Sequence, residues 1–125
     1  MHSPRRVQRQ RLRGWRMPNC AVAVDRSTSF GNPFTTETAI KLGFAFTEAG
    51  ARQVVVDEHR EWLEGKGDQD VYTFRSRTFD RRWVLGNLHR LKGRDLACFC
   101  PLPGPGLSDV CHAATLLGLA NGGAA

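Results

Sequence analysis

The chain has 125 residues, 41% of them apolar, and a formal net charge of +6, which fits one globular domain and excludes collagen-like and disordered chains. No apolar run approaches the roughly 20 residues of a membrane-spanning helix, and no apolar segment of a secretory signal follows the basic start. We therefore expect a cytoplasmic protein whose four cysteines are free thiols or metal ligands rather than disulfides.

Positive charge is concentrated at the start of the chain. The arginines that precede Asp25, the first acidic residue, are Arg5, Arg6, Arg9, Arg11, Arg13 and Arg16. Such a block attracts nucleic acid or the phosphates of a nucleotide, although the same composition is typical of a solvated tail. We expect residues 1–18 to form a basic arm that docks through Trp15 and Met17 on a single α/β domain at residues 19–122.

The first predicted elements flank a long loop. Residues 20–24 are apolar and partly β-branched, which predicts a buried strand. Residues 25–34 are dense in turn formers and predict a loop. Farther on, Leu42, Phe44 and Phe46 alternate with other residues, a pattern that predicts a second, weaker strand or an extended arm.

Two helices are expected in the middle of the chain. Over residues 51–63 apolar residues recur at helical spacing, and a glycine follows as a stop. Another apolar stripe predicts a helix over residues 78–91, with Thr78 as its N-cap and Gly93 after its end. We expect Asp57-Glu58-His59 to be a solvated face, because consecutive helical residues point in different directions and do not form a triad.

The final third predicts a strand, a loop and a helix. Residues 96–100 have the clearest strand pattern, and Ser108 or Asp109 is expected to cap a helix that ends at residues 121–122. The order of the elements predicts the α/β class: a small single-domain fold of two or three layers with a short, mostly parallel sheet.

The junction between this strand and the last helix is the strongest site candidate, because α/β proteins bind ligands at such junctions. Cys98 and Cys100 should share one face of the strand, while Cys111 and His112 open a helix whose N-terminus favours negative charge. One interpretation is a zinc site of all four side chains, although Cys-x-Cys is not the usual spacing. A second makes Cys111 or Cys100 a nucleophile with His112 beside it. In the third, backbone N–H groups from Ser108 onward hold a phosphate, and the cysteines are small buried residues.

The loop after the first strand is the second candidate. It offers a cation, a hydroxyl, a ring, a flexible backbone and an amide in Arg26, Ser29, Phe30, Gly31 and Asn32. Such a set suits a sugar–phosphate and a stacked base. It also suits a turn with its aromatic ring packed inward. No Walker or Gly-x-Gly-x-x-Gly fingerprint makes the prediction more specific.

Three motifs in this order connect the chain with a known family. The first motif has Arg5, Val7, Gln8 and Arg9 followed by Gly14-Trp15-Arg16-Met17-Pro18. The second is Ser29-Phe30-Gly31-Asn32-Pro33-Phe34, and the third is the cysteine segment Leu91–Ala113. With them, the chain resembles the "domain of unknown function 4326" family of bacteria and phages over nearly its whole length. The family usually has Trp at the positions of Phe30 and Phe99, and its loop before Cys-His is commonly shorter. The resemblance implies that the three motifs form one pattern, but it names no activity.

We therefore predict a protein that binds a phosphorylated, nucleotide-like small molecule, and the resemblance implies a phage protein that sequesters or processes a nucleotide or signal. The expected ligand-binding residues are Arg9, Arg11, Arg16, Arg26, Ser29, Phe30, Gly31, Asn32, Ser108, Cys111 and His112. One alternative is a nucleoside- or base-modifying enzyme that uses Cys111 or Cys100 with His112. Another is an accessory protein that binds nucleic acid through its arginines or zinc through Cys98, Cys100, Cys111 and His112. Apart from zinc we expect no cofactor, and we expect no membrane partner. The sequence leaves open whether a second copy of the chain completes the pocket in a homo-oligomer.

Overall fold

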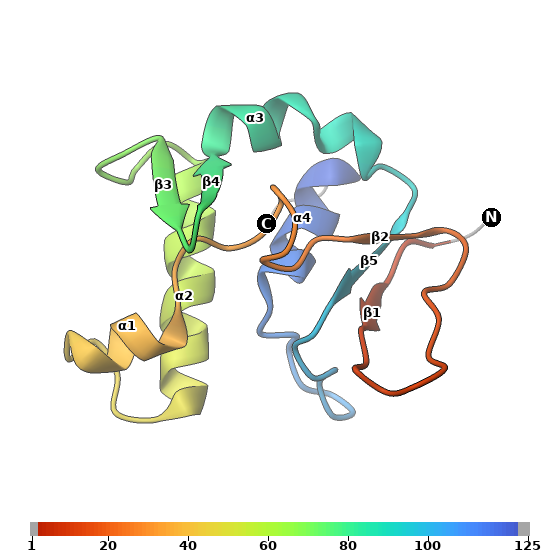
Figure 1. The fold of residues 1–125 in the computed structure, drawn as a ribbon, viewed down its shortest axis with the longest axis horizontal. Coiled ribbons are helices and arrows are strands. Elements are labelled where there is room, and N and C mark those ends of the chain that lie inside the picture. Colours follow the sequence, from red (N-terminus) through yellow and green to blue (C-terminus); the bar gives the residue numbers. More distant parts are fainter. Residues whose placement is uncertain (1–2, 123–125) are drawn as a thin grey trace.

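Three short parallel strands form the central sheet of the structure, a computed structural model that describes residues 3–122 (Figure 1). β1 (Arg6–Gln8) and β2 (Ala21–Ala23) lie on either side of β5 (Asp95–Cys98), so the strand order is β1-β5-β2. The strands predicted after the arginine-rich start and before the cysteine loop are confirmed as β2 and β5, each shorter than expected.

The central strand is buried along its whole length. A buried strand needs a partner on each edge for its backbone N–H and C=O groups. β1 supplies one of these partners from the arginine-rich segment, and it places Gln8 opposite Cys98. The start of the chain therefore lies beside the first cysteine of the Cys-x-Cys motif.

α2 (Glu48–Leu63) confirms the first predicted helix but begins earlier. The side chain of Thr47 accepts a hydrogen bond from the backbone N–H of Gly50 at 3.0 Å, which caps the helix at that point. α4 (His112–Ala120) lies between α2 and the sheet (Figure 1). The core is therefore formed by one face of α2, by α4 and by the covered face of the sheet, and Phe79, Val84 and Leu91 from the segment between α2 and β5 complete it.

The prediction of a helix over residues 78–91 is wrong in its first part. β3 (Val71–Phe74) and β4 (Arg77–Asp80) form an antiparallel hairpin there. Arg75 and Ser76 have φ angles of 49° and 67°, which is the backbone of a tight two-residue turn, and aromatic residues flank it. Cross-strand pairing therefore prevails over the helical pattern.

α3 (Arg81–Gly86) follows the hairpin, and the 3₁₀ turn η1 (Leu88–Arg90) follows α3. Asp80 caps α3 by accepting a hydrogen bond from the backbone N–H of Arg82 at 2.9 Å. Thr78, the predicted cap, lies inside β4 instead.

Of the two alternatives predicted at Leu42, Phe44 and Phe46, the second strand is wrong. α1 (Thr36–Lys41) occupies the preceding residues, and Gly43, with a φ angle of 82°, turns the chain toward α2. All three apolar side chains are exposed. Alternation alone does not make a strand, because a strand also needs a neighbour with which to pair.

α4 begins at His112, and not after Ser108 or Asp109 as predicted. Cys111 is its N-cap, and the Cys111 side chain makes no capping hydrogen bond. Asp109 instead accepts a hydrogen bond of 2.6 Å from Nε of Arg6. The carboxylate expected to cap the helix is therefore occupied by the arginine-rich segment.

The described residues form a small mixed α/β domain with a short parallel sheet and a small antiparallel hairpin, and the predicted fold class is confirmed. Within the part of the chain that the structure describes, no helix is both long and apolar enough to cross a membrane.

Candidate functional site

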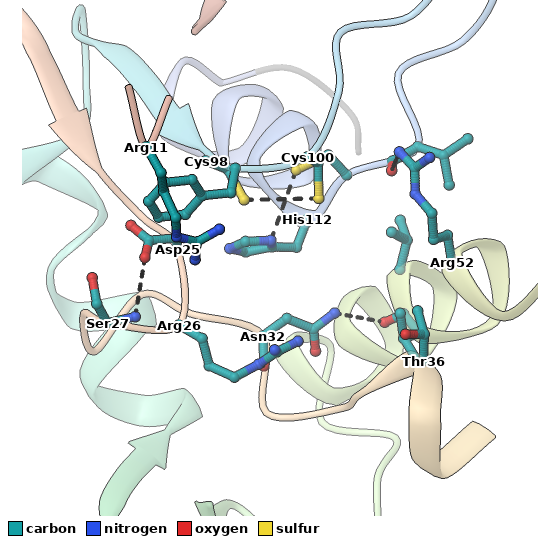
Figure 2. Close-up of a pocket in the computed structure, with 15 residues that line it drawn as sticks. Arg11, Asp25, Arg26, Ser27, Asn32, Thr36, Arg52, Cys98, Cys100 and His112 are labelled. Carbon is teal, nitrogen blue, oxygen red and sulfur yellow. Dashed lines mark hydrogen bonds between the residues drawn. The ribbon is translucent and has the colours of Figure 1, made fainter. Parts of the chain in front are cut away.

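A cavity of about 370 Å³ lies at the carboxyl ends of β2 and β5 (Figure 2). Its walls come from the end of β5, from the segments that follow β1, β2 and β5, from the starts of α1 and α4, and from α2. The lining residues are Arg11, Asp25, Arg26, Ser27, Asn32, Thr36, Arg52, Val55, Val56, Cys98, Phe99, Cys100, Val110, Cys111 and His112. Parallel strands deliver the loops that follow them to this edge, which is where α/β sheets bind ligands.

Cys98, Cys100 and Cys111, which we call the thiol cluster, lie together on one wall of the cavity. Their Sγ atoms all lie within 4.8 Å of one another, and Sγ of Cys98 donates to Sγ of Cys100 at 3.8 Å (Figure 2). Cys98 and Cys111 are buried, whereas Cys100 is half-buried. Such a group could hold a metal ion.

A buried arginine holds the loop that brings these cysteines together. Nη2 of Arg6 donates to the carbonyl oxygen of Pro101 at 2.6 Å, and Nε of Arg6 pairs with Asp109 at 2.6 Å. Arg6 thereby ties the two ends of the 101–110 loop to β1. The long loop returns to its starting point, so its length does not separate Cys111 from the Cys-x-Cys motif.

Hydrogen bonding among the three thiols shifts their pKa values in different directions. Hydrogen bonds from Cys111 and Cys98 hold the pKa of the Cys100 thiol well below its usual range. The pKa values of Cys98 and Cys111 are raised, chiefly because each thiol hydrogen-bonds to Cys100. The thiolate form is therefore most favoured at Cys100, which is also the least buried of the three residues.

His112 is a neutral side chain that ties α4 to the segment just after β2. Its Nε2 lies 2.6 Å from the carbonyl oxygen of Val24 and therefore carries the proton, which leaves a lone pair on Nδ1. That Nδ1 lies 3.9 Å from Sγ of Cys111. Burial lowers the pKa of His112, in agreement with a neutral ring.

Three arginines from three different segments line the cavity. The guanidinium of Arg11 lies over the ring of Phe99, 3.9 Å from its centroid. Arg26 donates to backbone carbonyl oxygens of its own loop, and Arg52 donates to the carbonyl oxygen of Val110 at 3.2 Å. Among the described residues, none of the three forms an ion pair with a carboxylate. Their positive charges are therefore available to a ligand.

Arg9, which was expected to bind the ligand, pairs instead with Asp25. Its Nη1 lies 2.7 Å from Oδ1 of Asp25, and the backbone N–H of Ser27 donates to the same carboxylate. Burial raises the pKa of Asp25, but the hydrogen bonds from Arg9 and Ser27 outweigh it and hold that pKa below its ordinary value. Asp25 is therefore an ionised, occupied group.

The structure brings part of the predicted ligand-binding set together. The predicted residues that line the cavity are Arg11, Arg26, Asn32, Cys111 and His112, together with Cys98 and Cys100 of the zinc and nucleophile interpretations. The predicted residues outside its lining are Arg9, Arg16, Ser29, Phe30, Gly31 and Ser108. Arg16 and Ser108 are exposed, and Ser29 is half-buried.

The loop after β2 uses its distinctive residues for packing. Phe30 is buried against Trp83, with ring centroids 4.9 Å apart. A Cβ atom on Gly31 would lie 2.5 Å from Cα of Arg26, so the close turn requires glycine there. Asn32 lines the cavity, but its amide donates to the carbonyl oxygen of Val55 at 2.9 Å and accepts from the backbone of the loop. The loop after β2 therefore forms a turn with the ring of Phe30 packed inward.

Arg52 and Thr36 are lining residues that sequence reasoning missed. Arg52 lies one helical turn before Val55 and Val56, which line the same wall of α2. That spacing was visible in the sequence, but nothing local shows that this face of α2 meets the cavity.

His59 corrects the prediction of a solvated face on α2. Its side chain is fully buried, and neither ring nitrogen has a hydrogen-bond partner within the described residues. Its ring meets the ring of His112 edge-on, with centroids 5.2 Å apart. Burial holds the pKa of His59 well below its ordinary value, so the ring is neutral.

Comparison of the chain with curated proteins found no match, and comparison with solved structures found none either. The family described as Domain of unknown function (DUF4326) has a model that matches residues 7–122. The match includes all the elements from β2 to α4 and every residue that lines the cavity. The family suggested by the three sequence motifs is thereby confirmed, and the chain belongs to the family described as Domain of unknown function (DUF4326).

Proposed function

We propose that this protein binds a small phosphorylated, nucleotide-like molecule in the cavity at the carboxyl ends of β2 and β5. The observation that carries the proposal is the set of three arginines around one cavity, Arg11, Arg26 and Arg52, none of which pairs with a carboxylate of residues 3–122. The cavity volume of about 370 Å³ lies in the range of small-molecule sites. Guanidinium groups suit phosphate because they offer paired N–H donors in a fixed plane.

Other lining residues suit the remainder of such a ligand. Ser27 and Thr36 offer hydroxyl groups for a sugar, and Val55 and Val56 offer an apolar wall for a base. Arg11 covers the ring of Phe99, so in this arrangement the base contacts the valines rather than that ring. The ligand class is a nucleoside phosphate held mainly through its phosphate.

Calorimetric titration with nucleoside monophosphates and with the matching nucleosides tests the proposal. The phosphorylated forms should bind at least about 10-fold more tightly, because a charge-assisted hydrogen bond contributes about 1.5–3 kcal/mol. Arg52→Ala should weaken this binding by a similar factor. The matched control is Arg60→Ala on the same helix, because Arg60 pairs with Asp57 and Glu64 outside this cavity. Absence of binding for every nucleotide at millimolar concentration would contradict the proposal.

Zinc binding by the thiol cluster is the second candidate function, and it does not exclude the first. With Zn–S bonds near 2.3 Å, a tetrahedral ion separates two sulfur ligands by about 3.8 Å. The Sγ atoms of Cys98 and Cys100 lie 3.8 Å apart. Native mass spectrometry of protein purified without chelator should show the mass of one zinc ion per chain, lost on acidification. Cys98→Ser should remove it, whereas Cys20→Ser, at the exposed fourth cysteine, should not.

A further inference from the structure

We propose that the thiol cluster is an open metal site. Cys98, Cys100 and Cys111 hold one zinc ion whose fourth coordination position faces the cavity, and an oxygen atom of the phosphorylated ligand fills that position. This inference rests on the proposed function for the class of ligand. It adds a second requirement: the ligand offers negative charge to the arginines and an oxygen atom to the metal.

The first argument is that the cluster contains three donors and not four. Among the described residues, no histidine nitrogen or carboxylate oxygen belongs to the group of atoms within 4.8 Å of one another. His112 donates from Nε2 to the carbonyl oxygen of Val24, and its Nδ1 lies 3.9 Å from Sγ of Cys111, but that nitrogen does not lie within 4.8 Å of all three sulfur atoms. Structural zinc sites are closed by four protein ligands, whereas sites with three protein ligands keep a position for water or substrate.

The second argument is the direction in which the cluster opens. All three cysteines line the same cavity as the arginines. Figure 2 shows the labelled Cys98 and Cys100 on one side of it and Arg26, Asn32 and Thr36 on the opposite side. An ion bound by the three sulfur atoms therefore has protein behind it and the ligand cavity in front of it.

The third argument is charge. A zinc ion with three thiolates carries one net negative charge and would by itself repel a phosphate. The arginines lining the cavity more than compensate for that charge, and none of them is neutralised by a carboxylate within the described residues. The same arginines thus make it possible for an anion to approach the metal.

X-ray absorption at the zinc edge of the zinc-loaded full-length chain tests the donor set without any ligand. The expected result is three sulfur neighbours and one oxygen neighbour, with no outer-shell scattering from an imidazole ring. Three sulfur atoms with one imidazole nitrogen would close the site and overturn the proposal, as would four sulfur atoms or failure to bind zinc. This result does not depend on whether nucleotides bind.

Titration of the cobalt-loaded chain with inorganic phosphate tests access from the cavity. Cobalt bound by thiolates absorbs visible light, and its bands change when the fourth ligand changes. Phosphate should shift these bands in a saturable way. Arg11→Ala should raise the half-saturating phosphate concentration at least 10-fold, because it removes one of the three arginine charges that line the cavity. Arg13→Ala, at an exposed position outside the cavity lining, is the matched control and should not change it.

The outcomes separate this inference from the proposed function. Unchanged cobalt bands, with calorimetry showing that nucleotides still bind in an Arg52-dependent way, would overturn the metal contact and leave the proposed function standing. A phosphate-dependent shift that Arg11→Ala does not weaken would overturn the inference that the metal and the arginines bind the same ligand. A saturable, Arg11-dependent shift on a three-sulfur site supports the inference.

Discussion

The two loops that stand out in the sequence use their distinctive residues in opposite ways. In the loop after β2, Phe30 packs on Trp83 and the amide of Asn32 binds the backbone of α2. Between the end of β5 and the N-cap of α4, Cys98, Cys100 and Cys111 instead line a cavity. The first loop builds the wall of the site, and the second supplies its reactive groups. A conspicuous motif therefore shows where precise structure is needed, but not whether the need is for packing or for chemistry.

The largest expected effect tests the packing role of the first loop. Phe30→Ala should lower the free energy of unfolding by about 3–5 kcal/mol, because it leaves a void beside Trp83 in the core. The measurement is urea unfolding followed by tryptophan fluorescence. Phe46→Ala, at a ring that is 94% exposed, should stay within about 0.5 kcal/mol of the parent. A small effect of Phe30→Ala on stability, together with loss of nucleotide binding, would show that Phe30 serves ligand binding rather than packing.

Asn32→Ala should cost about 2–4 kcal/mol of the same free energy. The substitution leaves the carbonyl oxygen of Val55 and the backbone N–H of Phe34 without the partners they have at 2.9 Å. Asn19→Ala, at an exposed position, is the control in the same unfolding series. Unchanged stability with weaker ligand binding would make Asn32 a ligand contact rather than a tie between the loop and α2.

The buried histidines make stability depend on pH. Burial lowers the pKa of both His59 and His112 in the folded chain, so the unfolded chain binds protons first as the pH falls. The contribution of these histidines to the free energy of unfolding is therefore fully present above about pH 6.5, the pKa of histidine in the unfolded chain. At lower pH the free energy of unfolding decreases by up to about 1.4 kcal/mol per pH unit for each histidine. Urea midpoints between pH 7.5 and pH 5 measure this slope.

His59→Leu should remove about half of that pH dependence. At pH 7.5 it should not lower the free energy of unfolding, unlike a substitution that leaves a cavity. The reason is that the ring nitrogens of His59 have no hydrogen-bond partners within the described residues. An unchanged slope would show that His59 takes up its proton at the same pH in the folded and the unfolded chain.

The smallest expected change in stability belongs to the second loop. Cys100→Ser should change the free energy of unfolding of the metal-free protein by no more than about 1 kcal/mol, because Cys100 is half-buried at the cavity wall. The same variant should lose zinc binding, measured by native mass spectrometry. Cys20→Ser should affect neither property. Loss of several kcal/mol from metal-free Cys100→Ser would place this loop among the packing elements as well.

The sequence alone determined the α/β class, the strands β2 and β5, the helix α2 and the location of the thiols at the sheet edge. These features follow from local patterns: short β-branched runs, apolar residues at helical spacing, and the order of the elements. It did not determine the hairpin at residues 71–80, since pairing with a neighbouring strand outweighed the helical pattern of Thr78 onward.

Only the tertiary structure decided which predicted residues share a site. Periodicity shows which residues lie on one face of an element, but not what that face meets. Arg52 faces the cavity because α2 packs on α4, and His59 is buried for the same reason. The three sulfur atoms meet because Arg6, from the other end of the chain, holds both ends of the loop between them, a contact over 103 residues that no local pattern encodes.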